Sequence, residues 1–94
     1  MSRRVVQLTR TAAKDLDRID RPLRDQLVRD LRDLEVDPTG RPPRMKRLRG
    51  HGAPLYRLRS GDYRVVYRLE DDLITVFRVI NRRDLERALR RLGI

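Results

Sequence analysis

The stretch LYRLRSGDYRVVYRLEDD, residues 55–72, alternates apolar and charged positions with the period of two that is typical of β-strands. The Ser-Gly-Asp segment at residues 60–62 is a turn, because glycine and aspartate favour turn conformations. The stretch therefore predicts a β-hairpin, with Tyr63, Val65 and Tyr67 on one face. A guanidinium is costly to bury without a partner, so we expect this aromatic face to pack in the core. The opposite face carries a set of arginines: Arg57, Arg59, Arg64 and Arg68.

Helices and further strands are predicted on both sides of the hairpin. Apolar residues recur at helical spacing in two segments before it and in one after it, and a loop rich in proline and glycine occupies residues 37–44. Since the apolar stripes of both segments before the hairpin need a partner surface, we expect an α+β fold: a twisted antiparallel sheet with a helical hairpin packed on one face. The predicted order is β-α-α-β-β-β-α. It starts with an edge strand at 5–8, a helix that starts at Thr9 or Thr11, and a helix at 22–34. The hairpin follows, then a strand at 73–80 and a helix from 82 that carries Leu85, Leu89 and Leu92.

Length and charge restrict the class of protein. With 94 residues, the chain is predicted to be a single domain spanning residues 1–94. It has 24 Lys plus Arg and 14 Asp plus Glu, a formal net charge of +10, which favours anionic partners: nucleic acid, an acidic protein or an anionic membrane surface. The sequence has no cysteine, no apolar run long enough for a membrane span and no apolar signal core near its start. We therefore expect a cytoplasmic protein that does not bind membranes.

The arginines of the hairpin have two interpretations. They form a solvated face neutralised by nearby acids such as Asp62, Glu70 and Asp71, or they bind a phosphate backbone or an acidic partner chain. The acids lie in the turns, whereas the strand positions are nearly all basic, and this favours an anionic ligand. Arg82 and Arg83, after the last predicted strand, would extend the same surface.

Other catalytic chemistries find little support. His51 is the only histidine, and in the loop sequence RGHGAP it is interpreted as a surface residue, because a lone histidine cannot supply a paired acid and base. Without cysteine and with one histidine, a zinc site is not expected. We predict no metal and no cofactor.

Three segments resemble one family over about nine tenths of the chain: LTRTAAKDLDRIDRPLRDQLVRDLRDLEVDP, then KRLRG, then LYRLRSGDYRVVYRLEDDLITVFRVINRRD. In this order they resemble the RelE/ParE superfamily of bacterial toxins from type II toxin–antitoxin systems. The most specific part is YRLRSGDYRVVY. The resemblance implies the RelE-like, microbial ribonuclease-like α+β toxin fold, which agrees with the periodicity.

The resemblance also implies a function and a set of site residues. RelE-like members cut messenger RNA in the ribosomal A site, whereas ParE-like members poison DNA gyrase. The RelE-like pattern implies catalytic roles for Arg57, Arg64 and one of Arg82 and Arg83. The other basic residues around them are predicted to bind RNA: Lys46, Arg47, Arg49, Arg59 and Arg68.

The sequence departs from the RelE-like pattern at three places. Leu55 replaces a further basic residue, Asn81 stands where many relatives have histidine, and Glu86 and Arg87 stand where the pattern has a tyrosine. Arginine stabilises a developing phosphorane, but it stays protonated and is a poor base for the 2′-OH.

Two functional hypotheses therefore stay open. The preferred one is a metal-independent, ribosome-dependent endoribonuclease that cleaves mRNA and arrests translation. The alternative is a ParE-like gyrase inhibitor, or a weakened toxin-like protein that acts only by binding its antitoxin. The predicted partners are the ribosome, mRNA and a cognate antitoxin with an acidic segment over the basic face or the helical hairpin.

Overall fold

The computed structural model of the protein describes residues 4–40, 43–48 and 54–92. One five-stranded sheet has the strand order β1-β5-β4-β3-β2. Strand β1 pairs in parallel with β5, and the other neighbours are antiparallel. The strands are β1 (Val5–Leu8), β2 (Met45–Arg47), β3 (Leu55–Ser60), β4 (Tyr63–Glu70) and β5 (Leu73–Asn81). The helices are α1 (Arg10–Asp17), α2 (Leu23–Leu34), the short 3-10 helix η1 (Arg82–Asp84) and α3 (Leu85–Arg91).

The predicted order of elements is confirmed, with one addition. Strand β2 was not predicted, because its three residues are too few to show a period. The sheet is also mixed and not purely antiparallel, since β1 runs parallel to β5. Of the two predicted helix starts, the structure has Thr9, whose side chain accepts a hydrogen bond from the backbone N–H of Ala12.

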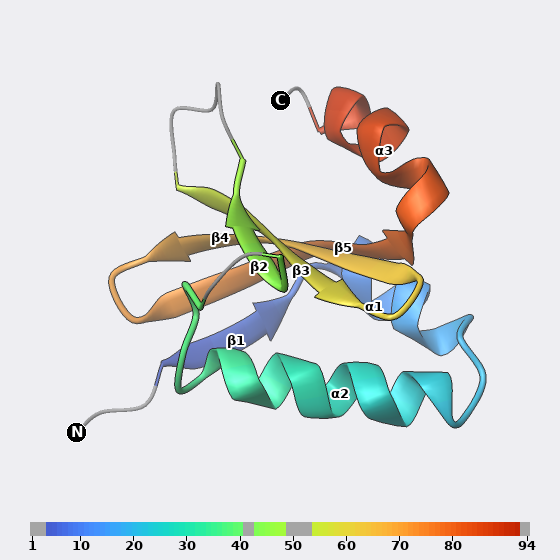
Figure 1. Ribbon diagram of the computed structural model, residues 1–94, viewed down its shortest axis with the longest axis horizontal. Helices are drawn as coiled ribbons and strands as arrows, with labels where there is room; N and C mark the ends of the chain where they lie inside the picture. The colour runs from blue at the N-terminus through green and yellow to red at the C-terminus, as the bar shows by residue number, and fades with distance from the viewer. Residues whose placement is uncertain (1–3, 41–42, 49–53, 93–94) are drawn as a thin grey trace.

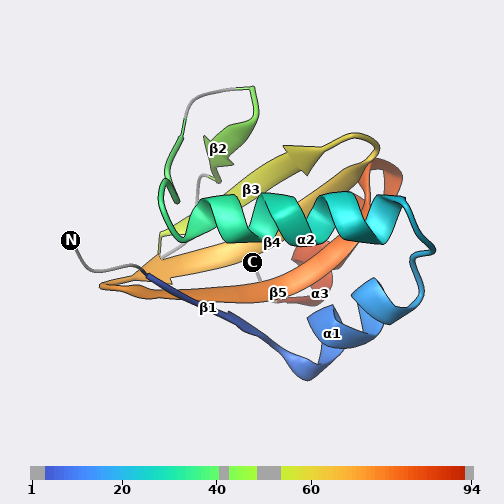
Figure 2. The same cartoon turned by 90° about the horizontal axis from the view of Figure 1, so that it is seen from below.

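Helices cover both faces of the sheet. Figure 1 shows α2 and α3 on opposite sides of it, and Figure 2 shows α2 lying across the sheet with α1 at one end. The main core lies between the helical hairpin α1–α2 and the sheet. The predicted core face of the β-hairpin is confirmed: Val65 and Tyr67 are fully buried there, and Tyr63 packs against them. The rest of this core comes from Ala12, Leu16, Ile19, Leu27, Leu31, Leu34, Met45, Leu58, Ile74, Val76 and Val79.

Four further buried apolar residues lie outside the main core, and the register places those on strands on the opposite face of the sheet. They are Leu55, Val66, Ile80 and Ala88. The sequence predicted a stripe of leucines on the last helix, but its buried residue is Ala88. The small side chain of alanine lets α3 approach β5 closely, and the leucines around it are only half-buried.

Strand β5 contains a β-bulge at Phe77. Val66 pairs with Arg78 and Tyr67 pairs with Val76, so Phe77 is an extra residue on β5. Its ring contacts the guanidinium of Arg68, whose carbon lies 5.4 Å from the ring centroid. Phe77 and Arg78 therefore share the face of the arginines, while Val76 and Val79 on either side remain in the main core.

The first helix closes the edge of β5 that β1 leaves uncovered. Asp15, with 8% of its surface exposed, accepts hydrogen bonds from the backbone N–H of Val79 (2.9 Å) and from Nε and Nη2 of Arg78 (2.8 and 3.3 Å). Thr9 donates its hydroxyl to the carbonyl of Phe77 (3.2 Å). These bonds give partners to the backbone N–H of Val79 and the carbonyl of Phe77, which β1 does not pair, and they hold α1 against β5.

We expect Asp15→Asn to lower the free energy of unfolding by about 1.5–3 kcal/mol, because it weakens three hydrogen bonds to a buried carboxylate. The measurement is urea denaturation followed by circular dichroism. Asp17→Asn, on an exposed position of the same helix, is the matched control and should change stability by less than about 0.5 kcal/mol. Equal losses in both variants would show that Asp15 contributes only surface charge.

Candidate functional site

The register of the sheet gathers basic side chains on one face, which we call the arginine face. Arg57 lies opposite Lys46, and Arg59 lies opposite Arg64. Directly opposite residues of an antiparallel pair point to the same side, with Cβ atoms about 4.5–5.5 Å apart. The face is the one turned away from the helical hairpin, and it is basic at Lys46, Arg57, Arg59, Arg64 and Arg68.

Arg57 lies in the middle of this face and is partly buried. Its Nη1 donates to the carbonyl oxygen of Pro43 at 2.8 Å. Burial lowers the pKa of Arg57, and the positive charge of Arg59 lowers it further. The protonated form is thus less favourable here than in water, although arginine remains charged in proteins. A bound anion would relieve this cost.

Arg64 lies where several guanidiniums come together. Its Nη1 donates to the carbonyl oxygens of Gly61 (2.9 Å) and Tyr63 (2.8 Å). Burial lowers the pKa of Arg64, and the charges of Arg57, Arg59 and Arg82 act in the same direction. We call Arg57, Arg59, Arg64 and Arg82 the arginine cluster.

The end of β5 brings Arg82 beside the turn of the β-hairpin. The backbone N–H of Arg82 donates to the carbonyl of Asp62 (2.7 Å), and its Nε lies 3.8 Å from Oδ1 of Asp62. Arg83 is held differently: its backbone N–H and its Nε both donate to Oδ1 of Asn81, at 3.1 and 3.3 Å. Of the two arginines that the sequence left open, Arg82 is the one that joins the cluster.

The turn that carries the cluster is anchored to the helical hairpin. The hydroxyl of Ser60, at the end of β3, donates to Asp30 on α2, and Asp30 is only 7% exposed. Arg44 pairs with Asp30 (3.3 Å) and with Asp33 (2.8 Å). Gly61, which follows Ser60 in the turn, has a φ of 56°, a conformation that glycine adopts without strain. The two strands that carry the cluster are therefore joined by a well-supported turn.

The remaining predicted site residues are placed less centrally. Arg68 is on the arginine face but is paired with Glu70 (2.6 Å) and lies over Phe77. Arg47 pairs with Tyr56, which packs against the main core, so Arg47 points to the face opposite the arginine face. Its role in RNA binding stays a prediction. Arg49 and His51 lie outside the described residues.

The arginine cluster can stabilise negative charge but cannot take up a proton. Within residues 4–40, 43–48 and 54–92, the cluster pairs with one carboxylate, that of Asp62, which is 75% exposed. The solvated-face interpretation, with acids balancing the arginines, therefore fits Arg68 better than it fits the cluster. The same part of the chain has no group of three acidic or histidine side chains that could hold a metal ion.

Sequence reasoning assigned no role to three arginines on or near α3, namely Arg78, Arg87 and Arg91. They line a pocket beside the arginine face. The available signal was the spacing Asp84, Arg87, Ala88 and Arg91, which places these residues on one face of a helix.

Solved structures of RelE-type toxins share this architecture. The archaeal RelE–RelB complex from Pyrococcus horikoshii OT3 contains a chain that superposes with a TM-score of 0.74 at 29% identity, over 87% of this chain and 97% of that one. The RelBE2 complex of Mycobacterium tuberculosis gives 0.71 at 28% identity, over 84% and 98% of the two chains. The isolated RelE toxin of E. coli gives 0.71 at 21% identity, over 95% and 98%. No curated protein matches the sequence.

The mixed sheet with a helical hairpin on one face is thus the fold of the RelE-like toxins. The family model described as "ParE toxin of type II toxin-antitoxin system, parDE" matches residues 6–86, and the chain belongs to this family. It is the toxin of a type II toxin–antitoxin system within the RelE/ParE superfamily. No helix among the described residues is long and apolar enough to cross a membrane.

Proposed function

We propose that this toxin arrests translation as a metal-independent endoribonuclease that cleaves mRNA on the ribosome. In this proposal residues 1–94 act as one toxin domain in the cytoplasm. The observation that carries the proposal is the arginine cluster, where burial and mutual repulsion lower the pKa of Arg57 and Arg64. Such a cluster is poised to bind the scissile phosphate, because an added negative charge relieves both effects.

The chemistry assigned to the cluster is charge stabilisation. The 2′ oxygen of the RNA attacks the adjacent phosphorus, the bond to the 5′ oxygen breaks, and the products are a 2′,3′-cyclic phosphate and a 5′-hydroxyl. Arg57 and Arg64 donate hydrogen bonds to the phosphorane oxygens, where negative charge develops. Arg82 adds positive charge from the end of β5, and Arg59 adds it from the opposite strand.

The proton transfers must come from groups other than arginine. The 2′-OH loses a proton and the 5′ oxygen gains one, and neither task suits a guanidinium that stays protonated. We propose that the ribosome orients the RNA so that positioning supplies much of the rate. Positioning by the ribosome would explain how the site can act with arginines and with no histidine among the described residues.

A second candidate function is inhibition of DNA gyrase. The observation that favours it is the match of residues 6–86 to the ParE toxin family. In this case the arginine cluster would contact DNA phosphates or acidic residues of gyrase and no bond would be cleaved by the toxin.

We also propose that a cognate antitoxin silences the toxin. The toxins from Pyrococcus horikoshii and Mycobacterium tuberculosis were solved in complexes with RelB antitoxins, which supports a partner of this kind. An acidic segment of the antitoxin would balance the formal charge of +10 by covering the arginine face or the helical hairpin.

The experiment that tests the proposed function is addition of the purified toxin to a translating cell-free extract, followed by primer extension on the message. We expect cuts at defined codon positions, and only when ribosomes are translating. Cuts in naked RNA of the same sequence should be far weaker. Intact message together with stalled gyrase–DNA cleavage complexes would instead establish the second candidate.

A further inference from the structure

A buried carboxylate lies on the other side of the sheet from the arginine cluster. Asp30, on α2, is only 7% exposed and uses both of its oxygens. Oδ2 accepts a hydrogen bond from the hydroxyl of Ser60, and Oδ1 accepts from Nε2 of Gln26 (3.0 Å) and Nη2 of Arg44 (3.3 Å). Because α2 covers the face of the sheet turned away from the arginines (Figure 1), Asp30 can affect a bound phosphate only through these partners.

The bond to Ser60 leads to Arg64. Ser60 is the last residue of β3, and Gly61 follows it in the turn. The carbonyl oxygen of Gly61 accepts a hydrogen bond from Nη1 of Arg64 at 2.9 Å. One end of the chain of contacts is therefore the buried carboxylate of Asp30, and the other end is a guanidinium of the cluster.

The bond to Arg44 leads to two further arginines of the cluster. The carbonyl oxygen of Arg44 accepts from the backbone N–H of Arg59 at 2.6 Å. The carbonyl oxygen of Pro43, one residue earlier, accepts from Nη1 of Arg57 at 2.8 Å. The segment that holds Arg57 and Arg59 is thus tied to α2 by the ion pair between Arg44 and Asp30.

Both connections need a carboxylate at this position. An ionised aspartate accepts hydrogen bonds with two oxygens, so it can take Ser60 on one and Arg44 on the other. An asparagine has one acceptor oxygen, and its amide nitrogen would face one of these two donors. Hydrogen bonds to a charged acceptor are also shorter and stronger than neutral ones. Asparagine should therefore keep only one of the two connections.

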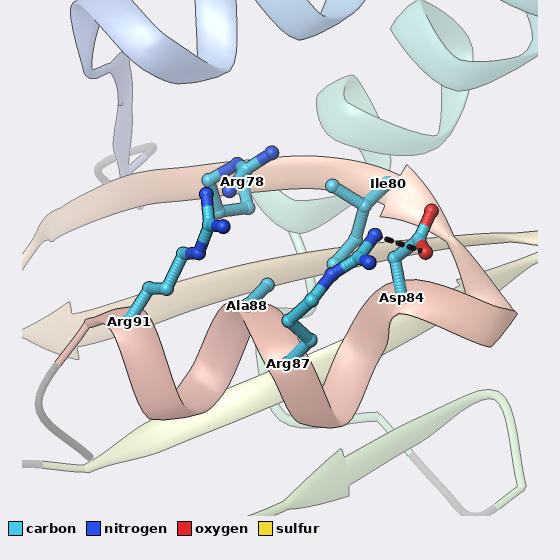
Figure 3. A pocket seen from close by; sticks show the side chains of 6 residues that line it. All are labelled: Arg78, Ile80, Asp84, Arg87, Ala88 and Arg91. Carbon is cyan, nitrogen blue, oxygen red and sulfur yellow. Dashed lines mark hydrogen bonds and ion pairs between the residues drawn. The ribbon is translucent and has the colours of Figure 1, made fainter.

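Two other acids show what distinguishes Asp30. Figure 3 shows Asp84 paired with Arg87 (2.6 Å), and these side chains are 44% and 63% exposed. Exposed pairs of this kind hold their partners weakly. Asp15 is buried like Asp30, but its partners lie on β5 outside the arginine cluster. Of the three, Asp30 is the acid whose bonds reach the segments that carry the cluster.

We propose that Asp30 is a positioning residue for the cleavage of RNA: by holding Ser60 and Arg44, it sets the spacing of the guanidiniums that bind the phosphate. The inference rests on the proposed function and adds a residue on the far side of the sheet. Donors stabilise a developing anion only when they are already in place, and a displacement of about 1 Å can cost about a hundredfold in rate. Because the phosphorane exists only in the transition state, a loss of positioning should slow cleavage more than it weakens binding.

The first test compares Asp30→Asn with two matched variants. Asp33→Asn makes the same change on an exposed position of the same helix, and Asp15→Asn makes it at a buried acid away from the cluster. Single-turnover cleavage of mRNA on programmed ribosomes is measured against toxin concentration, with circular dichroism to confirm that each variant is folded. We expect Asp30→Asn to lower the maximal rate by about tenfold or more and to raise the half-saturating concentration by less than about threefold. Both controls should stay within about twofold of the wild type. Equal losses of rate in Asp30→Asn and Asp15→Asn would reduce Asp30 to a structural residue and overturn the proposal.

Ser60 allows the same test without any change of charge, and it decides the matter if Asp30→Asn does not fold. Ser60→Ala removes the hydroxyl and should slow cleavage, whereas Ser60→Thr keeps a hydroxyl and should restore most of the rate. The double variant Asp30→Asn/Ser60→Ala should be no slower than Asp30→Asn alone, because both changes break the same contact. A threonine variant no faster than the alanine variant, or losses that multiply in the double variant, would show that Asp30 does not act through Ser60.

A measurement without RNA separates this inference from the proposed function. The Nε–Hε resonances of Arg57 and Arg64 are followed by NMR in the free toxin. Asp30→Asn should shift them, and Asp15→Asn should leave them in place. If the wild type does not cut mRNA but these resonances shift, the proposed function fails while Asp30 still positions the cluster. Resonances that stay unchanged in folded Asp30→Asn would overturn the inference, whether or not the wild type cuts mRNA.

Discussion

Replacing Tyr67 with alanine should lower the free energy of unfolding by about 3–5 kcal/mol, as expected for a large buried aromatic residue. Tyr67 is fully buried in the main core, where its ring stacks on Tyr56 with the centroids 5.6 Å apart. Its hydroxyl donates a hydrogen bond to the carbonyl of Pro38 at 2.6 Å. The substitution would leave a cavity between β4 and the helical hairpin and would free the segment around Pro38.

Tyr67→Phe is the matched variant, because it removes the hydrogen bond but keeps the ring. It should cost only about 1 kcal/mol near neutral pH. Burial raises the pKa of Tyr67 above that of a free tyrosine. A tyrosine whose pKa is higher in the folded than in the unfolded protein stabilises the fold fully only below the pKa of the unfolded state, about 10. Above that pH the unfolded state loses its proton first, and the stability contribution is lost as the pH rises toward the folded-state pKa. The wild type should therefore lose stability above that pH more steeply than Tyr67→Phe.

Both effects are measured by urea denaturation, repeated across the alkaline range. If Tyr67→Ala unfolds like the wild type but no longer binds RNA, Tyr67 belongs to the binding face and the assignment of the two faces is wrong.

Replacing Arg64 with alanine should abolish growth arrest on induction and slow mRNA cleavage by on the order of a hundredfold or more, because a preorganised charge contact to a developing anion is lost. The fold should remain intact. The two hydrogen bonds of Arg64 go to carbonyls of its own turn and include an exposed one to Gly61. Arg64→Lys should restore only part of the activity, since a lysine cannot form paired bonds in the same geometry.

Arg68→Ala is the control on the same strand and the same face. Arg68 is paired with Glu70 and lies over Phe77, away from the cluster, so its loss should affect arrest much less. The measurement is growth after induction and primer extension in the translating extract, with circular dichroism for each variant. Equal effects of Arg64→Ala and Arg68→Ala would mean that the face acts by general electrostatics.

The two faces of the β-hairpin could be predicted from the sequence because alternation alone assigns them. Tyr63, Val65 and Tyr67 lie where the period of two places them, and the arginines lie opposite. The helical hairpin was predictable for a similar reason, since its leucines repeat at helical spacing and require a partner surface. Local periodicity is sufficient wherever a long segment has one face buried.

The parts that could not be predicted depend on pairing between distant segments. The face of Arg47 follows from the register of β2 against β3, and three residues carry no periodicity of their own. Which of Arg82 and Arg83 joins the arginine cluster depends on two hydrogen bonds at the end of β5. Arg82 donates its backbone N–H to the carbonyl of Asp62, whereas Arg83 donates its backbone N–H to the side chain of Asn81. The pocket at α3 was missed because a buried alanine gives a weaker signal than a stripe of leucines.

The bulge at Phe77 has a consequence for how the length of this protein can vary. A strand that loses one residue normally exchanges its two faces from that point onward. In β5 the residues on either side of Phe77 already alternate correctly without it, with Val76 and Val79 inward and Arg78 outward between them. A deletion of Phe77 would therefore keep every later side chain of β5 on its present face and Arg82 beside Arg64. A deletion within β4 would turn Arg64 into the core. Of the two strands, β5 is thus the one that can lose a residue, at Phe77, without loss of the arginine cluster.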